Sequence, residues 1–345
     1  MGFAWCRHYR IIGDLDKLTG YVTSLTFWEC IMKKILSGML IVALLVGGCQ
    51  KKQEGLQGTI TISGAWALYP MVVKWAEEFQ KLRPQIKIDV SAGGAGKGMA
   101  DCLAQVVDIG MVSREVNPAE IEKGAWWVSV VKDAVVATIN EKNPALNELL
   151  TKGVSRETFI KIWITGEVKN WGQVTGGKIS EPIHVYTRSD ACGAAEIWAK
   201  FLGKKQEDLG GVGVYGDPGL VEAVRKDVLG IGFNNINYAY DANSKEQIKQ
   251  IKVLPIDLNA NGLIDSNENF YKNQNEIAGA IATGKYPSPP ARALHLVSKG
   301  KPTKKIVTEF IKWILTDGQK YVPDAGYINL PQNKLQQELT KLESK

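Results

Sequence analysis

The chain has 345 residues, of which 45% are hydrophobic and 23% charged, so it is long enough for two domains of ordinary globular composition. Its net charge of +6 is mild, and no dense Lys/Arg stripe with interleaved aromatic residues occurs, which argues against nucleic acid as a partner. The five cysteines and three histidines form no close cluster, so we do not expect a zinc site.

The N-terminal region carries an export signal. The run 32-MKKILSGMLIVALLVGGCQKK-52 places two lysines before an apolar stretch, small residues and Cys49, which is the order of a secretory signal. Its end resembles a bacterial lipoprotein signal, in which the cysteine is lipidated; an ordinary signal peptide is the alternative. We interpret residues 1–48 as a spurious upstream segment plus a lipoprotein signal peptide, and 49–58 as a lipidated tether to the outer face of a membrane.

Strands and helices alternate directly after the tether. The β-branched run TITISG indicates a strand, and the apolar residues that follow repeat at helical spacing until Pro84 ends the helix. In chain order the pattern predicts a strand, a helix, a strand, a helix and a strand at 59–64, 68–84, 86–91, 99–107 and 108–113. This alternation is typical of a parallel sheet of the α/β class.

The same alternation continues to the C-terminus. We expect further strands at 127–139, 183–188, 229–239, 251–256 and 293–300. We expect further helices at about 146–152, 155–163, 193–202, 218–227, 274–283 and 303–318. The order predicts two α/β lobes with more than one crossing between them, each a mostly parallel sheet flanked by helices. We assign 59–138 and 285–345 to lobe 1 and 139–284 to lobe 2.

Four turns that follow predicted strands are rich in Gly, Ala and Ser. They are 63-SGAWALYP-70, 91-SAGGAGKG-98, 108-DIGMVSRE-115 and 187-TRSDACGAA-195. Small residues there let a ligand approach backbone N–H groups, and ligands of open α/β sheets bind beyond the carboxyl ends of strands. The dinucleotide fingerprint and the phosphate-loop pattern are both absent, since the glycine spacing differs and Lys97 precedes Gly98. Each turn alone is more often a tightly packed connection than a site.

Taken together and in order, the turns resemble the periplasmic phosphate-binding protein family, the substrate-binding components of bacterial phosphate ABC transporters. The resemblance covers essentially all of the chain after the signal. It rests on 64-GAWALYP-70, 93-GGAGKGMAD-101, 107-VDIGMVSRE-115, 188-RSDACGAAE-196 and 229-LGIGF-233. It implies a type II periplasmic-binding-protein fold whose lobes close on a dehydrated oxyanion, with no catalytic step. It also implies a monomer that delivers phosphate, or a related oxyanion, to permease subunits in the inner membrane.

The resemblance assigns residues of the first two turns to the anion site. Ala65, Trp66 and Ala67 fall where the family's first turn supplies a Ser/Thr hydroxyl pair and a backbone N–H. Ala95, which precedes Gly96, falls where a serine caps the second turn. The backbone of both turns is therefore kept, but the hydroxyl groups are missing.

The third and fourth turns are assigned in the same way. Asp108 matches the carboxylate that accepts a proton from hydrogen phosphate, and Arg188 with Asp190 matches the arginine–aspartate pair. The family's Ser-Gly-Thr is replaced by Cys192, Gly193 and Ala194. A thiol at a helix start could be reactive, or it could be a small packing residue in place of serine.

The missing hydroxyls leave the identity of the ligand open. Each lost donor removes about 0.5–1.5 kcal/mol, or about 1.5–3 kcal/mol when the acceptor is charged. Backbone N–H groups at helix N-termini and the guanidinium of Arg188 remain, and Ser113 or Arg114 could donate instead. A weaker phosphate site fits, and so does another oxyanion or an organic acid that stacks on Trp66. Alternatively, Trp66 fills the space between the lobes.

The segment 257-DLNANGLIDSNE-268 matches the pattern D-x-[DN]-x-[DN]-G-x5-E of a calcium loop. The expected ligands are Asp257, Asn259, Asn261, the carbonyl of Leu263, Asp265 and Glu268. Because a strand and not a helix precedes it, we expect a single structural Ca²⁺ site. An Asx-rich turn without metal is the alternative. A calcium-stabilised surface or signalling protein without a transport role is therefore a second hypothesis.

We expect no enzyme, since no nucleophile–base pair or catalytic metal site is visible.

Overall fold

The computed structural model describes residues 56–344. The predicted signal peptide, Cys49 and all but the last residues of the tether lie outside these residues. Among the described residues, no helix combines the length and apolar character needed to cross a membrane.

A nine-stranded sheet runs through both lobes in the order β2-β1-β3-β11-β4-β8-β6-β7, with β9 beside β4. Its strands are β1 Gly58–Gly64, β2 Ile86–Ala92, β3 Ile109–Val112, β4 Ala125–Asn140, β6 His184–Arg188, β7 Val212–Val214, β8 Gly230–Asn235, β9 Ile251–Val253 and β11 Ala291–Lys299. The pairs β1–β2, β1–β3, β6–β7 and β6–β8 are parallel. The central pairs of β4 and β11 are antiparallel. A short parallel pair, β5 Val154–Ser155 and β10 Ile256–Asp257, lies apart.

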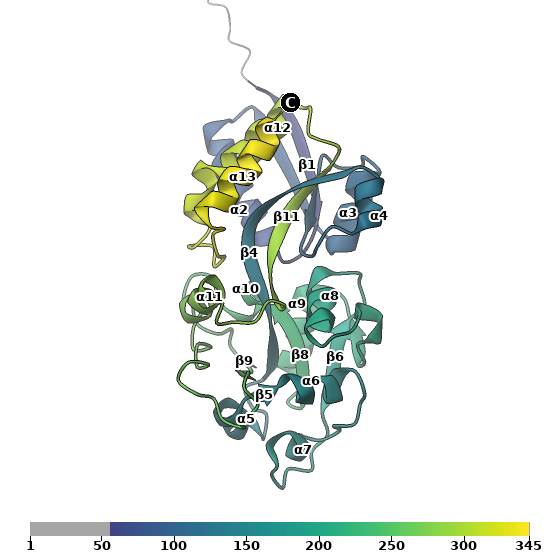
Figure 1. Cartoon of the computed structure of the whole chain (residues 1–345), viewed down its shortest axis with the longest axis vertical. Helices are drawn as coiled ribbons and strands as arrows, with labels where there is room; N and C mark the ends of the chain where they lie inside the picture. Colours follow the sequence, from purple (N-terminus) through teal and green to yellow (C-terminus); the bar gives the residue numbers. More distant parts are fainter. Residues whose placement is uncertain (1–55, 345) are drawn as a thin grey trace, which may run out of the picture. The chain divides into compact units, whose positions relative to one another are not determined.

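Strands β4 and β11 pass from one lobe into the other (Figure 1). Val131 and Leu294 belong to the hydrophobic core of lobe 1, whereas Ala134 and Ala291 belong to the core of lobe 2. On both strands, the residues therefore pass from one hydrophobic core to the other within a few positions. The boundaries expected at 138/139 and 284/285 lie several residues from this point, because β4 continues through it as one strand.

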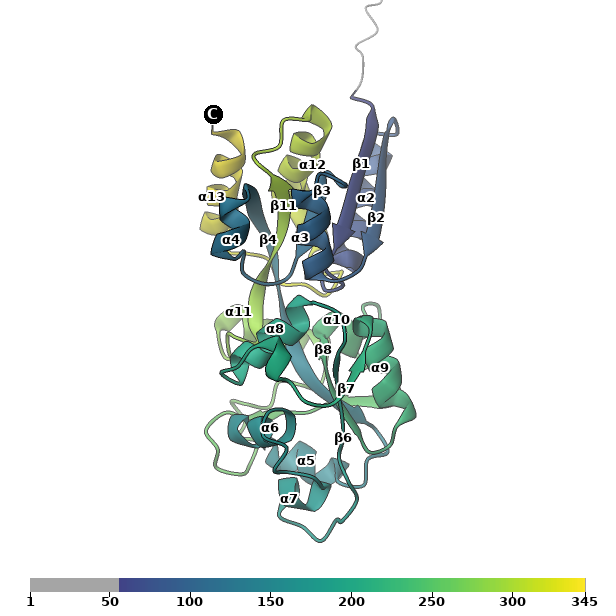
Figure 2. The same cartoon turned by 90° about the vertical axis from the view of Figure 1, so that its right-hand side faces the viewer.

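Five helices cover the sheet of lobe 1. They are α2 Tyr69–Leu82, α3 Ala95–Leu103, α4 Pro118–Glu122, α12 Lys305–Leu315 and α13 Gln332–Glu343. Figures 1 and 2 show α3 and α4 on one face and α2, α12 and α13 on the other. The apolar stripe of α2 includes Val72, Trp75 and Phe79, all buried, as the helical spacing predicts.

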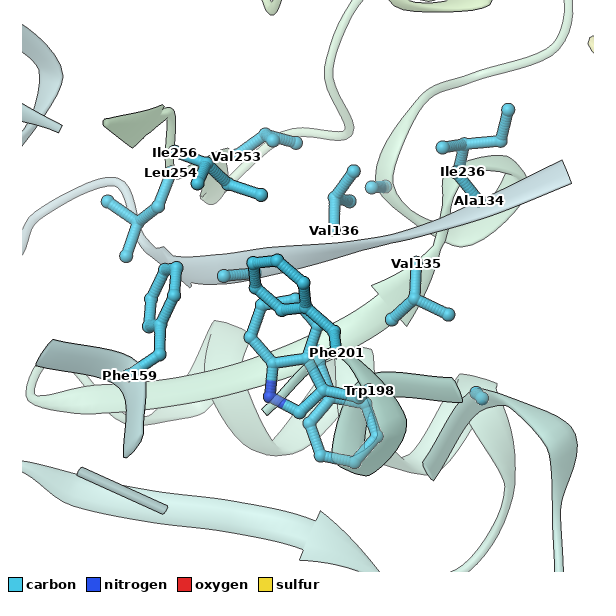
Figure 3. Close-up of a cluster of buried hydrophobic side chains, with 14 of the residues drawn as sticks. Ala134, Val135, Val136, Phe159, Trp198, Phe201, Ile236, Val253, Leu254 and Ile256 are labelled. Carbon is cyan, nitrogen blue, oxygen red and sulfur yellow. The ribbon is translucent and has the colours of Figure 1, made fainter. Parts of the chain in front are cut away.

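The helices of lobe 2 surround β6, β7, β8 and the second half of β4. They are α5 Leu146–Lys152, α6 Arg156–Trp163, α7 Trp171–Thr175, α8 Gly193–Phe201, α9 Gly216–Lys226, α10 Ile236–Ala239 and α11 Gln274–Thr283. Figure 3 shows Phe159, Trp198 and Phe201 packed against strand residues. The ring of Trp198 stacks on Phe233 with 5.9 Å between centroids, so α8 packs directly on β8.

One predicted strand is wrong in its second half. The run 229–239 forms β8 only to Asn235, after which α10 begins at Ile236. The side chain of Asn235 bonds to Asp217 and Arg292, and these long-range contacts hold the chain where it turns. The predicted helix at 303–318 ends at Leu315 and continues as a 3₁₀ turn over Asp317–Tyr321.

Candidate functional site

The turns of the two lobes meet where the strands end, and Figure 2 shows α8 of lobe 2 next to α3 of lobe 1. The backbone N–H of Gly96 donates to the carbonyl of Ala191 at 3.1 Å. A Cβ atom on Gly193 would lie 2.3 Å from Oγ of Ser113. The structure therefore brings together the second, third and fourth turns. Of the site residues predicted from the four turns, those buried are Ala65, Ala67, Ala95, Ser113, Arg188, Cys192, Gly193 and Ala194.

Trp66, in the first turn, reaches across to lobe 2. Its ring contacts Tyr215 at 6.2 Å between centroids, edge to face, and lies against Gly216. Its carbonyl accepts a hydrogen bond from the hydroxyl of Tyr238 at 3.2 Å. Within residues 56–344 its buried Nε1 has no hydrogen-bond partner. The indole thus fills space between the lobes, which was one of its two expected roles.

Arg188 is the central charged residue of the fourth turn, and its side chain is 0% exposed. Nε and Nη2 donate to the two oxygens of Asp190 at 2.8 and 2.7 Å, and Nη1 donates to Asp217 at 2.6 Å. Burial opposes the charge of the guanidinium, but the attraction of Asp217 and Asp190 outweighs it and raises the pKa of Arg188. The guanidinium has five N–H groups. Three of them donate to partners in the described part of the chain, and two remain.

Asp217 is a site residue that sequence reasoning missed. It lies in the first turn of α9, is 1% exposed, and accepts hydrogen bonds from Arg188 and Asn235. A signal was present: 213-GVYGDPG-219 is a fifth Gly-rich turn between a strand and a helix. Because β7 has only three residues, this turn was not recognised as the end of a strand.

Asp108 does not lie with the other turns, so its expected role at the anion is wrong. Its carboxylate accepts hydrogen bonds from the N–H and the hydroxyl of Thr61 and pairs with Lys304. It precedes β3, whereas Ser113 follows it, which separates the two on the order of 15 Å. The motif 107-VDIGMVSRE-115 therefore contributes its end to the site and its beginning to the opposite edge of lobe 1.

Cys192 takes the capping place of the missing serine. Its Sγ accepts a hydrogen bond from the N–H of Ala195 at 3.4 Å, at the start of α8. Burial raises the pKa of the Cys192 thiol to about 12, with only partial compensation from Arg188. The burial of the thiol and its cap on α8 therefore favour the packing role over the reactive one. Cys102 is also buried, and no disulfide joins the two within residues 56–344.

Arg114, which was considered as a replacement donor, is already engaged. It pairs with Glu120 at 2.7 Å and with Glu196 of lobe 2 at 3.0 Å. A cavity of about 540 Å³ adjoins these residues and is lined from both lobes, including Gly96 and Ala191. It lies beside the meeting point of the second and fourth turns. The hydroxyl of Ser113 lies where the third and fourth turns meet, against Gly193.

The predicted calcium loop lies in lobe 2. Asp257 and Glu268 are 5% and 3% exposed, and their carboxylates accept hydrogen bonds from backbone N–H groups of Gly262 and Leu258, respectively. Gly262 has φ = 81°, as the sharp turn at the sixth loop position requires. Across 56–344, no three His, Cys, Asp or Glu side chains are arranged as metal ligands. In the same residues no Lys or Arg pairs with Asp257 or Glu268.

Comparison with known proteins places the chain in a family. A family model described as a PBP superfamily domain matches residues 50–318, and the chain belongs to this family. It is 23% identical over 330 residues to the phosphate-binding protein PstS of Staphylococcus haemolyticus, covering 91% of this chain and 96% of that protein. It is 28% identical over 288 residues to PstS of Bacillus subtilis, covering 83% and 85%.

Solved structures share the fold. A putative phosphate ABC transporter substrate-binding protein with bound phosphate from Clostridium perfringens superposes with a TM-score of 0.65 and 22% identity. An ABC-type phosphate transport receptor from Vibrio cholerae superposes with a TM-score of 0.57 and 21% identity. Each match covers 79% of this chain and 100% of the other. The expected two-lobed α/β fold is confirmed.

Proposed function

We propose that this protein is an extracytoplasmic substrate-binding protein that captures phosphate for an ABC importer. The observation that carries the proposal is the position of Arg188, completely buried where turns of both lobes meet, with two N–H groups left for a ligand. Two of the helices that begin there, α3 and α8, direct backbone N–H groups and positive dipole ends toward the same place. The phosphate-binding names of its relatives support the same ligand.

The geometry suggests how binding proceeds without hydroxyl side chains. Phosphate would accept hydrogen bonds from Arg188 and from the backbone N–H groups of Gly193 and Ala194, with Ser113 as the available hydroxyl. Closure about β4 and β11 would exclude water and strengthen these bonds. Binding and release would then follow lobe movement, with no covalent step.

The ligand class is tested by calorimetric titration of residues 50–345 with phosphate, sulfate, molybdate and small carboxylates. We expect phosphate to bind more tightly than about 10 µM, roughly −7 kcal/mol, and ahead of the other anions. If another anion bound more tightly than phosphate, the protein would still be a substrate-binding protein, but that anion would be its ligand. No anion binding would favour a surface or signalling role.

We also propose that Cys49 anchors the protein by a lipid to the outer face of a membrane, where permease subunits of the importer receive the ligand. The order of the signal sequence, with two lysines, an apolar run and VGGC, supports this anchor.

We further propose that the loop 257–268 binds one structural Ca²⁺. Asp257 and Glu268 are buried carboxylates whose charge is balanced, in the described residues, by no cationic side chain. Buried charges are normally paired or bound to metal, and the loop supplies the oxygen ligands that Ca²⁺ prefers. The side chains of Asn259 and Asn261 both hydrogen-bond Asp265, which keeps further oxygens close by.

Removing calcium is expected to lower the melting temperature by a few degrees. A weak extracellular loop filled at millimolar calcium contributes about 1–2 kcal/mol through mass action. Thermal melts with and without a chelator measure the effect, and Glu268→Gln should abolish it. Glu181→Gln, an exposed change elsewhere in lobe 2, is the matched control. If the chelator left the melting temperature of the unchanged protein the same, the result would count against bound calcium.

A further inference from the structure

A buried polar network leads from the anion site to the crossover strands. Asp217, which binds Arg188, also accepts a hydrogen bond from Nδ2 of Asn235 at 2.6 Å. The Oδ1 atom of Asn235 in turn accepts from Nη2 of Arg292. Arg292, on β11, also donates from Nε to the carbonyl of Ser113 at 3.2 Å. The network therefore connects the third turn, the fourth turn and β11.

The network ends at Asp133, on β4 opposite Arg292. Asp133 is 0% exposed, and within residues 56–344 no side chain donates a hydrogen bond to its carboxylate, which faces the backbone N–H groups of Ala134 and Ile236. Its nearest cation is Nη1 of Arg292, at 3.5 Å, which likewise has no hydrogen-bond partner in that part of the chain. A buried carboxylate without a side-chain donor is costly in its charged form, so Asp133 is the member of the network that most readily takes up a proton.

The charges that face Asp133 come from several elements. Arg292 of β11 favours its charged form, whereas Asp217 of α9 opposes it. Three phenols also lie near it: Tyr238 of α10, Tyr286 before β11, and Tyr327. Burial is the largest influence and raises the pKa of Asp133 to about 6, with Arg292 acting in the opposite direction.

The charge balance of the network disfavours an added anion. Three carboxylates, Asp133, Asp190 and Asp217, face two guanidinium groups, Arg188 and Arg292, so the network carries a net charge of −1. Like charges repel strongly where water is excluded. One proton would bring the network to neutrality. Asp190 and Asp217 accept charge-assisted hydrogen bonds from Arg188 that protonation would weaken, whereas no side chain of the described residues donates to Asp133.

We propose that anion capture at this site is coupled to the uptake of one proton by Asp133. The inference rests on the proposed anion-binding function and adds its regulation. Anion binding favours the protonated carboxyl, and by linkage a protonated carboxyl favours the anion. Affinity is therefore highest below the pKa of the free protein and falls as pH rises, by up to about tenfold per pH unit.

Calorimetric titration with phosphate in two buffers of different ionisation enthalpy measures the protons taken up. At about pH 7 the unchanged protein should take up close to one more proton per phosphate than Asp133→Asn. The comparison removes phosphate's own protonation, which both proteins share. At about pH 8, Asp133→Asn should bind about tenfold more tightly. Asp89→Asn on β2, where Asp89 is half exposed and pairs with Lys87, is the control and should behave as the unchanged protein.

A second measurement needs no substitution. With ¹³C-labelled aspartate, one carboxyl signal should titrate near pH 6 and move to higher pH when phosphate is added. Equal proton uptake by the unchanged protein and Asp133→Asn, or carboxyl titrations that phosphate leaves unaltered while calorimetry shows binding, would overturn the inference. Absence of phosphate binding at every pH would instead overturn the proposed function, and the inference with it.

Discussion

Replacement of Arg188 by alanine is expected to abolish phosphate binding and to destabilise the protein by about 3–5 kcal/mol. The substitution removes three hydrogen bonds and leaves Asp190 and Asp217 buried without their cation. Calorimetry measures the first effect and urea unfolding the second. Arg83→Ala is the control, because the side chain of Arg83 is exposed and, among the described residues, bonds only to the neighbouring carbonyl of Leu82.

Arg188→Lys separates binding from folding. Lysine keeps the positive charge but not the planar two-pronged contact with Asp190, so the fold should persist while phosphate binding weakens about tenfold or more. If either variant bound phosphate as tightly as the unchanged protein, Arg188 would not be the anion's principal partner.

Gly193→Ala is expected to weaken phosphate binding roughly ten- to hundredfold with a small effect on unfolding. The new Cβ would lie 2.3 Å from Oγ of Ser113 and 2.4 Å from its carbonyl oxygen. The hydroxyl can rotate away, but the carbonyl cannot, so the third and fourth turns must separate. Overpacking of this kind costs about 1–3 kcal/mol. Here that cost weakens the contact between the two lobes.

The matched control for Gly193→Ala is Gly279→Ala. Gly279 lies in α11, and apart from its chain neighbours and the backbone of its own helix no described heavy atom comes within 4 Å of its added Cβ. This change should leave phosphate affinity unaltered and stabilise the helix by about 0.5–1 kcal/mol. Titrations of both variants provide the comparison, and equal affinities would show that contact between Ser113 and Gly193 is not part of the bound state.

Much of the fold was predictable because hydrophobic residues recur at clear intervals along its strands and helices. The strand at 59–64 and the helix at 68–84 correspond to β1 and α2, since alternating β-branched residues and a helical apolar stripe are local signals. Helix α13 was missed because its twelve residues are mostly polar and bury only Leu335, Glu338 and Leu342. The end of β8 was missed because its cause, the contacts of Asn235, lies in distant residues.

The site was predictable only in part, for a similar reason. The turns that follow strands correctly predicted that Ser113, Arg188 and Gly193 belong to one site. Asp108 was misplaced because a motif that contains a whole strand has residues at both ends of it. Asp133 was not recognised, since a single aspartate in an apolar strand gives no sign of its partners.

The loss of hydroxyls changes the chemistry of the site less than the sequence suggests. Cys192 keeps the cap of α8 through its sulfur, and Ala65, Ala67 and Ala95 are packed within the cores. What remains for an anion is a set of backbone N–H groups, one guanidinium and the hydroxyl of Ser113. This arrangement requires close approach of the two lobes, which explains why contacts such as Gly96 to Ala191 are made by small residues.

A crystal structure of residues 50–345 grown with phosphate tests the central claim most directly. The account predicts one phosphate between the lobes, within hydrogen-bond distance of Arg188 and of the backbone N–H groups of Gly193 and Ala194. It would be contradicted by lobes that close with the indole of Trp66 in that position and no anion at Arg188.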